Sequence, residues 1–159
     1  MSSSPKLTYS WTQYKKDIHY IADNIEFKHV VGIYRGSLPI ATHLSNIKNV
    51  KMSIIGFQTR DGKDKSPAWI INKMGHQVNK GILLVDDIYD TGTTFRAVKD
   101  LPEFQNNPDY TLIALFGNKN DDGVHYLHEQ LRKWIVFPWE RTPDPVHVHN
   151  EQCQHEGNK

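Results

Sequence analysis

Short apolar runs alternate with amphipathic and polar segments along the chain. The strongest helical pattern has apolar residues at spacings of four, three and four, which share one helix face: Tyr14, Ile18, Ile21 and Ile25. Ser10 precedes this pattern, and Gln13 follows Ser10 three residues later, which is typical of a capping box at a helix start. The sequence therefore predicts an amphipathic helix of about four turns after Ser10.

Six short apolar segments have the length and composition of buried strands. They cover residues 29–34, 50–57, 69–71, 81–85, 110–116 and 134–137. Residues 38–44 and 94–101 suit helices, and the second helix is expected to end near Pro102. Strands that alternate with helices predict an α/β domain with a mainly parallel sheet, whose ligands bind beyond the carboxyl ends of the strands.

Polar segments divide the chain into parts. Residues 58–67 hold no hydrophobic residue and three cations, Arg60, Lys63 and Lys65, so we expect a mobile loop that could close as a lid. Residues 1–9 are expected to be flexible and residues 10–140 to form one domain. The polar residues 141–159 are expected to form a poorly ordered tail.

Composition and charge exclude several classes of partner. With 159 residues, 38% of them hydrophobic, the chain has the size and composition of one globular domain. The formal net charge of +1 indicates no broad basic surface for nucleic acid or an anionic membrane. Cys153 is the single cysteine, so no disulfide can form within the chain, and no apolar run approaches the roughly 20 residues of a membrane span. We therefore expect a cytoplasmic protein that holds any anion in a shaped local site.

The segment after the apolar residues 82–85 carries the most informative chemistry. It contains three acids, Asp86, Asp87 and Asp90, and then the run Thr91, Gly92, Thr93 and Thr94. Small hydroxyls and closely spaced backbone N–H groups at a helix start favour a bound phosphate, and glycine permits the tight turn. Asp86 and Asp87 would repel that phosphate, so we expect them to face ribose hydroxyls or a Mg²⁺ ion beside it. Solvated carboxylates before an ordinary helix cap are the alternative.

A second polar turn follows the predicted strand 29–34. It consists of Arg35, Gly36 and Ser37, and an arginine on a glycine turn supplies hydrogen-bond donors and positive charge for a pyrophosphate. A surface arginine without a ligand is the alternative. The sequence contains neither the G-x-x-x-x-G-K-[ST] loop of nucleoside triphosphatases nor the G-x-G-x-x-G fingerprint of dinucleotide enzymes.

Residues 82–94 resemble the signature with which type I phosphoribosyltransferases bind 5-phosphoribosyl 1-pyrophosphate (PRPP), and residues 35–37 resemble their pyrophosphate loop. This resemblance implies a parallel sheet flanked by helices, a small hood subdomain and a cis peptide bond in the pyrophosphate loop. It implies that residues 91–94 hold the 5-phosphate and that Asp86 and Asp87 contact the ribose diol and Mg²⁺. It also implies that Asp90 accepts a proton from the purine ring.

The C-terminal third resembles the xanthine-guanine branch of this family. The resemblance implies that Trp134 stacks on the purine, that the backbone of Ile135 contacts its 2-position and that Lys119 donates to its 6-oxygen. From the residues alone, a core position for Trp134 and a solvated charge for Lys119 are the favoured interpretations.

The resulting hypothesis is a purine salvage enzyme that needs Mg²⁺. It would transfer the 5-phosphoribosyl group of PRPP to xanthine, guanine or hypoxanthine and release the nucleoside 5′-monophosphate and pyrophosphate. The alternatives are transfer to a pyrimidine and a PRPP- or nucleotide-binding regulator on the same fold. The resemblance further implies a homodimer or homotetramer.

Overall fold

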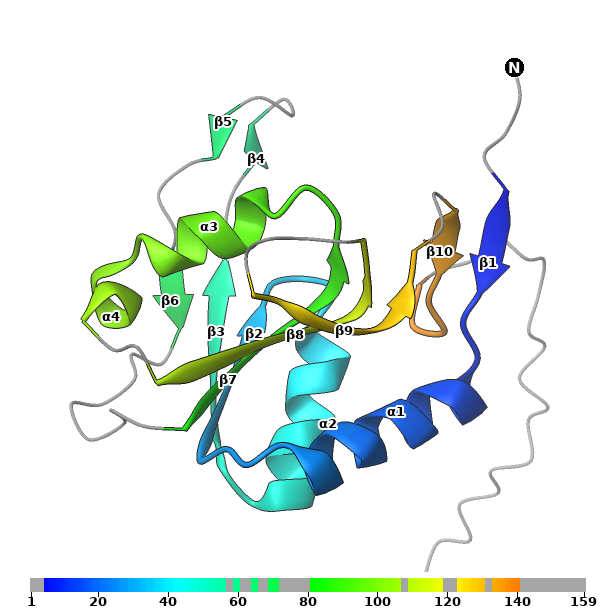
Figure 1. Cartoon of the computed structure of the whole chain (residues 1–159), viewed down its shortest axis with the longest axis horizontal. Helices are drawn as coiled ribbons and strands as arrows, with labels where there is room; N and C mark the ends of the chain where they lie inside the picture. The colour runs from blue at the N-terminus through cyan, green and yellow to red at the C-terminus, as the bar shows by residue number, and fades with distance from the viewer. Residues whose placement is uncertain are drawn as a thin grey trace, which may run out of the picture.

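A six-stranded sheet forms the centre of the computed structural model, which describes residues 5–56, 59–60, 64–65, 69–71, 81–106, 109–118, 123–130 and 133–140 (Figure 1). The strands lie in the order β6 (Trp69–Ile71), β3 (Lys51–Gly56), β2 (His29–Ile33), β7 (Ile82–Tyr89), β8 (Tyr110–Gly117) and β9 (His125–Glu129). Neighbouring strands are parallel except for β3 and β6, which are antiparallel. The predicted mainly parallel sheet is confirmed.

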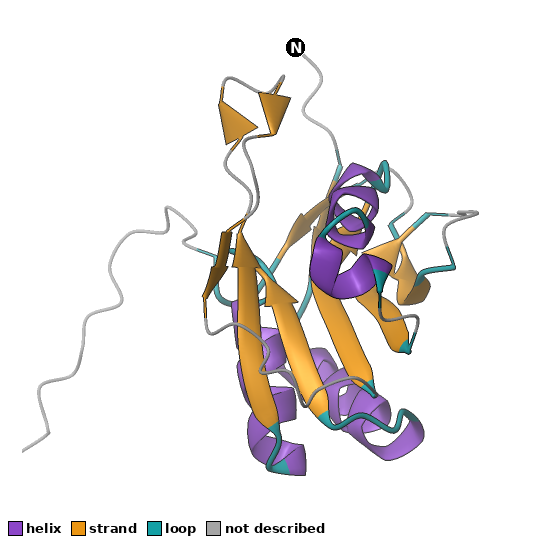
Figure 2. Cartoon of the chain, turned by 90° about the vertical axis from the view of Figure 1, so that its left-hand side faces the viewer, coloured by secondary structure: helices purple, strands orange, loops and turns teal. Residues whose placement is uncertain are grey.

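Helices cover both faces of this sheet (Figure 2). On one face, α1 (Trp11–Asn24) and α2 (Leu38–Lys48) pack on the side chains of Leu83 and Val85. On the other face, α3 (Thr93–Lys99) and α4 (Pro102–Gln105) pack on Ile82 and Leu84. Because successive strand residues point to opposite faces, the continuous apolar run of β7 supplies both halves of the core. None of the helices in the described ranges is long and apolar enough to cross a membrane.

A separate two-stranded sheet, which we call the hood, lies beside the central sheet (Figure 1). It pairs β1 (Lys6–Thr8) with β10 (Trp134–Val136) in parallel, with Leu7 opposite Ile135. The expectation that residues 1–9 are flexible is therefore wrong for β1. Three residues are too few for a recognisable strand pattern, and their partner lies at the other end of the described chain.

Only one of the two hydrogen bonds of the predicted capping box is present at Ser10. The Ser10 side chain caps α1 by accepting a hydrogen bond from the backbone N–H of Gln13 at 3.1 Å, so the predicted helix start is confirmed. The side-chain amide of Gln13 does not return to Ser10 but donates to Asp17 Oδ1 at 2.9 Å.

Two further elements differ from the sequence-based expectation. Residues 58–67, predicted as a loop, contain the antiparallel pair β4 (Thr59–Arg60) and β5 (Asp64–Lys65). In Figure 1 this pair projects beyond the end of the sheet at which β3 ends. Strand β9 was not predicted at all, because it is a partly exposed edge strand that carries two histidines and a glutamate.

Candidate active site

The topology brings two chain segments together at one edge of the sheet. From β2 the chain continues to β3 on one side, whereas β7 continues to β8 on the other side, and β2 and β7 are parallel neighbours. In sheets of this kind, ligands bind beyond the carboxyl ends of the strands at such a reversal of direction. Gly32 lies opposite Val85 in the ladder, so the turn after β2 and the acids after Val85 meet at the same level.

The turn after β2 lies directly against the acid pair. The peptide bond between Tyr34 and Arg35 is cis, as the resemblance implied, and Arg35 is exposed to solvent. A Cβ atom placed on Gly36 would overlap the carboxylate of Asp87. Only glycine therefore allows the Arg35 turn and the acid pair to approach this closely.

Ser37 has a different position from the one its predicted role suggests. It is fully buried, and its hydroxyl donates to the carbonyl oxygen of Ile33 at 2.5 Å. Its side chain therefore closes the turn instead of projecting from it. Only the backbone of Ser37 is left to bind PRPP, and this role stays a prediction.

Asp86 and Asp87 belong to the last part of β7 and not to a loop. Asp86 is buried, and its Oδ1 accepts a hydrogen bond from the backbone N–H of Asp87 at 2.9 Å. Asp87 is half-buried, and its Oδ1 accepts from the backbone N–H of Ile88 at 2.8 Å. Burial raises the pKa of Asp87 above its usual range, because its negative charge is removed from water. A cation or a set of hydroxyl donors beside this pair would offset that cost.

The acid pair fits the way proteins hold Mg²⁺. This ion commonly takes one or two carboxylates and completes its coordination with water and substrate phosphates. Within the described residues, no three His, Cys, Asp or Glu side chains form a cluster that could hold a metal by themselves. Asp86 and Asp87 would thus bind Mg²⁺ together with a phosphorylated substrate, and the ion would screen negative charge on that substrate.

The segment after β7 forms a small hollow of about 70 Å³, lined by the continuous run of residues 88–95. Gly92 has a φ of 75°, a left-handed conformation that lets the chain turn sharply into α3. The hydroxyls of Thr91 and Thr93 face each other at 2.8 Å, and both residues are exposed. Hydroxyls and turn amides around such a hollow are suited to a phosphate group. Asp90, at the rim of the same hollow, is also exposed.

Sequence reasoning missed Arg96, on α3. Its guanidinium donates to the carbonyl oxygen of Thr91 at 2.5 Å, which ties the helix to the start of the hollow. The contact places a positive charge next to the proposed phosphate position. The sequence does show a cation five residues after Thr91, but this position is not part of the signature at residues 82–94 on which the prediction was based.

The structure describes two of the three predicted base-binding residues, Trp134 and Ile135. Trp134 is 62% exposed, so it is not the core residue that the pattern alone favoured. Ile135 next to it is 3% exposed and anchors β10, which leaves only its backbone for a ligand. Lys119 lies outside the described residues, and its role stays a prediction.

Comparison with known proteins identifies the family. Residues 10–141 match the family described as phosphoribosyl transferase domain. The chain belongs to this family. The matched range includes both the turn at Arg35 and the segment from Asp86 to Thr94.

Individual relatives indicate enzymes and a regulator. The chain is 26% identical over 148 residues to the xanthine-guanine phosphoribosyltransferase of Gluconobacter oxydans, covering 86% of this chain and 85% of that protein. It is also 29% identical over 121 residues to the transcriptional regulator GfcR of Methanococcus vannielii, covering 73% of this chain but 58% of that protein. Among solved structures, a purine phosphoribosyltransferase from Pyrococcus horikoshii has the same fold. Its TM-score is 0.70 at 24% identity, covering 87% of this chain and 96% of that one.

The close approach of Gly36 to Asp87 gives a first testable prediction for this phosphoribosyltransferase-family chain. In Gly36→Ala the added Cβ overlaps the Asp87 carboxylate, so either the Arg35 turn or the Asp87 side chain must move, and both change the arrangement of turn and acid pair. We expect PRPP affinity, measured by isothermal titration calorimetry with Mg²⁺, to fall about tenfold or more. Gly123→Ala is the control for backbone strain without a clash: nothing lies within 4 Å of a Cβ there, but its φ of 73° disfavours alanine, so we expect lower stability with unchanged PRPP affinity. Unchanged PRPP affinity in Gly36→Ala would show that the turn and the acids do not act on one ligand.

Proposed function

We propose that this protein transfers the 5-phosphoribosyl group of PRPP to a 6-oxopurine base, with Mg²⁺ as cofactor. The observation that carries the proposal is the meeting of the Arg35 turn, the acid pair and the threonine-lined hollow at one edge of the sheet. PRPP presents a pyrophosphate, a ribose diol and a 5-phosphate, and each group has a matching partner in this arrangement. By family likeness we expect a cytoplasmic homodimer or homotetramer.

Each part of the site has one task in the reaction. The hollow at residues 91–94 holds the 5-phosphate, and Asp86 and Asp87 accept hydrogen bonds from the ribose diol. A ring nitrogen of the base forms a bond to C1 of the ribose while the bond from C1 to the pyrophosphate oxygen breaks. Arg35 stabilises the negative charge that develops on the leaving pyrophosphate, and Asp90 accepts the proton of the attacking nitrogen.

The choice of base rests on the hood. Trp134 exposes a flat aromatic face on β10, which suits stacking on a purine. Lys119 would donate to an oxygen at the 6-position, which favours 6-oxopurines over adenine with its 6-amino group. The likeness to a xanthine-guanine phosphoribosyltransferase over 86% of this chain supports the same choice.

A second candidate function is a regulator that binds PRPP or a nucleotide without turnover. The likeness to GfcR favours it, because that relative is 29% identical over 121 residues. A regulator needs the phosphate hollow and the acid pair, but it needs neither a proton acceptor nor a stacking surface. The exposed positions of Asp90 and Trp134 therefore favour the enzyme.

Turnover with a panel of bases separates these functions. The purified protein is mixed with Mg²⁺, PRPP and xanthine, guanine, hypoxanthine, adenine, uracil or orotate, and pyrophosphate release is measured. We expect release with at least one of the three 6-oxopurines and none with adenine. Release with uracil or orotate alone would favour a pyrimidine enzyme. Binding of PRPP without release of pyrophosphate from any base would favour the regulator.

A further inference from the structure

The hood needs an anchor, because a two-stranded sheet has little stability by itself. It carries Trp134, whose side chain is 62% exposed, so the position of this ring is set mainly by the backbone of β10. That backbone is held by β1: the N–H of Trp134 donates to the carbonyl oxygen of Pro5, and the N–H of Tyr9 donates to that of Val136, both at 3.0 Å. A contact that restrains β1 therefore also restrains β10 and, through it, Trp134.

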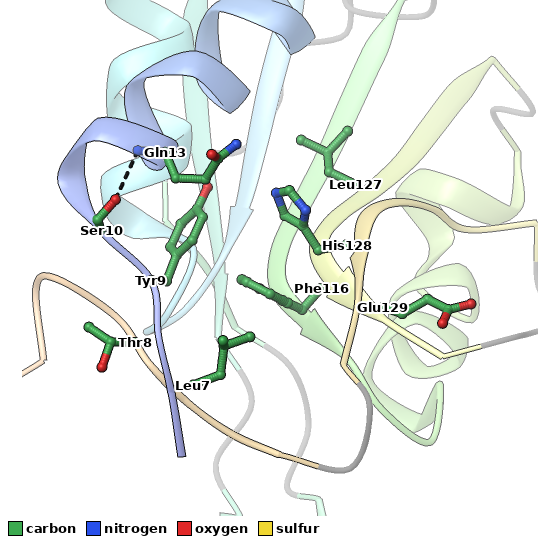
Figure 3. A pocket seen from close by; sticks show the side chains of 9 residues that line it. All are labelled: Leu7, Thr8, Tyr9, Ser10, Gln13, Phe116, Leu127, His128 and Glu129. Carbon is green, nitrogen blue, oxygen red and sulfur yellow. Dashed lines mark hydrogen bonds between the residues drawn. The ribbon is translucent and has the colours of Figure 1, made fainter. Parts of the chain in front are cut away.

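Packing joins the hood to the central sheet in part, because Tyr9, Ile135 and Phe137 share a hydrophobic core with Phe116 of β8. A cavity of about 590 Å³ lies between the two, lined by residues of β1, the start of α1, and strands β8 and β9 (Figure 3). Leu7 and Tyr9 line it on the hood side, and Phe116 and Leu127 line it on the sheet side. Beside this packing, the directional contacts across the cavity restrain where β1 lies.

One buried carboxylate provides those contacts. Asp17 on α1 is 7% exposed, and its Oδ2 accepts a hydrogen bond from the Tyr9 hydroxyl at 2.5 Å. The same oxygen accepts from His128 Nε2 on β9 at 2.6 Å, since a carboxylate can only accept. Its Oδ1 accepts from the Gln13 side chain at 2.9 Å. In Figure 3 the Tyr9 hydroxyl, the Gln13 amide and the His128 ring are turned toward one another.

These bonds connect three separate elements. Tyr9 directly follows β1, Asp17 lies on α1 and His128 lies on the edge strand of the central sheet. The Tyr9 ring is also held edge-on against Phe116 and Phe137, so the hydroxyl is directed and not free to rotate away. Loss of the hydroxyl would release β1 from α1 and from β9 without emptying the aromatic core.

We propose that Asp17 is a positioning residue for the base-binding strand: by holding Tyr9 and His128, it fixes the hood and Trp134 over the active-site edge of the sheet. The inference rests on the proposed function, because it assigns Trp134 to the base. A shift of about 1 Å in a substrate-positioning group can lower a rate a hundredfold, so a loosened hood is expected to impair base binding clearly.

The test compares two tyrosine variants. Tyr9→Phe removes the hydroxyl that meets Asp17, and Tyr20→Phe removes one from a tyrosine on α1 that is 56% exposed. In Tyr9→Phe we expect the KM for the base to rise roughly tenfold and the KM for PRPP to stay within about twofold. Tyr20→Phe is expected to leave both values unchanged. Asp17→Asn, which weakens the contacts of Tyr9 and His128 together, should produce the larger change in the same direction.

Hydrogen exchange separates this inference from the proposed function. Faster exchange is expected in Tyr9→Phe at the amides of residues 6–9 and 134–136, with unchanged exchange in β7. Equal changes in both KM values, or unchanged exchange in the hood, would overturn the positioning role. If the wild-type protein turns over no base, the proposed function fails, and the exchange measurement alone then decides whether Asp17 holds the hood.

Discussion

Asp90→Asn is expected to lower turnover about a hundred- to ten-thousandfold, the range of a lost general base. The amide keeps the size of the side chain but cannot accept the proton of the attacking ring nitrogen. Asp90 is exposed at the rim of the phosphate hollow, so its replacement leaves the core packing intact. PRPP binding should therefore stay within about twofold of the wild type, because the hollow and the acid pair are unchanged. Steady-state kinetics with the preferred base and calorimetry with PRPP measure the two quantities.

Asp100→Asn is the matched control for this variant. Asp100 is also an exposed aspartate, and it lies at the other end of α3, where it caps the helix. The same chemical change there should leave kcat within about twofold. If Asp90→Asn retained wild-type turnover, another group would have to accept the proton, and the family-based assignment of Asp90 would be wrong.

Local patterns predicted those parts of the fold that depend on neighbours in sequence. The apolar stripe from Tyr14 to Ile25 identified α1, and the continuous apolar run at residues 82–85 identified β7. The hollow at residues 88–95 lies on the segment to which the sequence assigned phosphate binding, and it consists of one continuous stretch of chain; its phosphate role stays a prediction. Its residues could be assigned from chemistry and spacing before any contact was known.

Features that depend on distant pairing were not predictable in this way. β7 extends to Tyr89 because Asp86 and Ile88 pair with Ala114 and Phe116 of β8, although aspartate has a low strand propensity. The hood joins residues from the two ends of the described chain. The bond between Asp17 and His128 spans 111 positions, and nothing near either residue in sequence indicates it. Such contacts are set by topology, which the periodicity of short segments does not specify.

The two acids at the end of β7 show how function and stability oppose each other in this site. Because burial raises the pKa of Asp87, the folded protein retains a proton at pH values where the unfolded chain, with the ordinary value of 3.8, has lost it. The free energy of unfolding therefore falls as the pH rises through that window and stays lower above it. Above that window the wild type carries the full cost of an ionised, half-buried Asp87.

Asp87→Asn is accordingly expected to unfold at a higher temperature than the wild type at neutral pH. Each unit by which the pKa is raised corresponds to about 1.4 kcal/mol, and 1 kcal/mol shifts the Tm of a chain of this size by roughly 2–4 °C. The amide oxygen can still accept from the backbone N–H of Ile88, so the local hydrogen bond is retained. The advantage over the wild type should shrink as the pH is lowered and should be smallest below 3.8, where the carboxyl becomes protonated in both states.

The same variant is expected to lose function. An amide offers neither the charge that attracts Mg²⁺ nor two acceptors for the ribose diol, so turnover should fall about a hundredfold or more. Thermal denaturation at several pH values and pyrophosphate release measure both effects on one preparation, with Asp100→Asn again as the exposed control. A lower Tm for Asp87→Asn than for the wild type at neutral pH would contradict the conclusion that the buried charge of Asp87 destabilises the fold. So would a difference in Tm that grows as the pH is lowered. A stabilised protein without turnover would show that this carboxylate is kept in place for binding, at a cost to the stability of the fold.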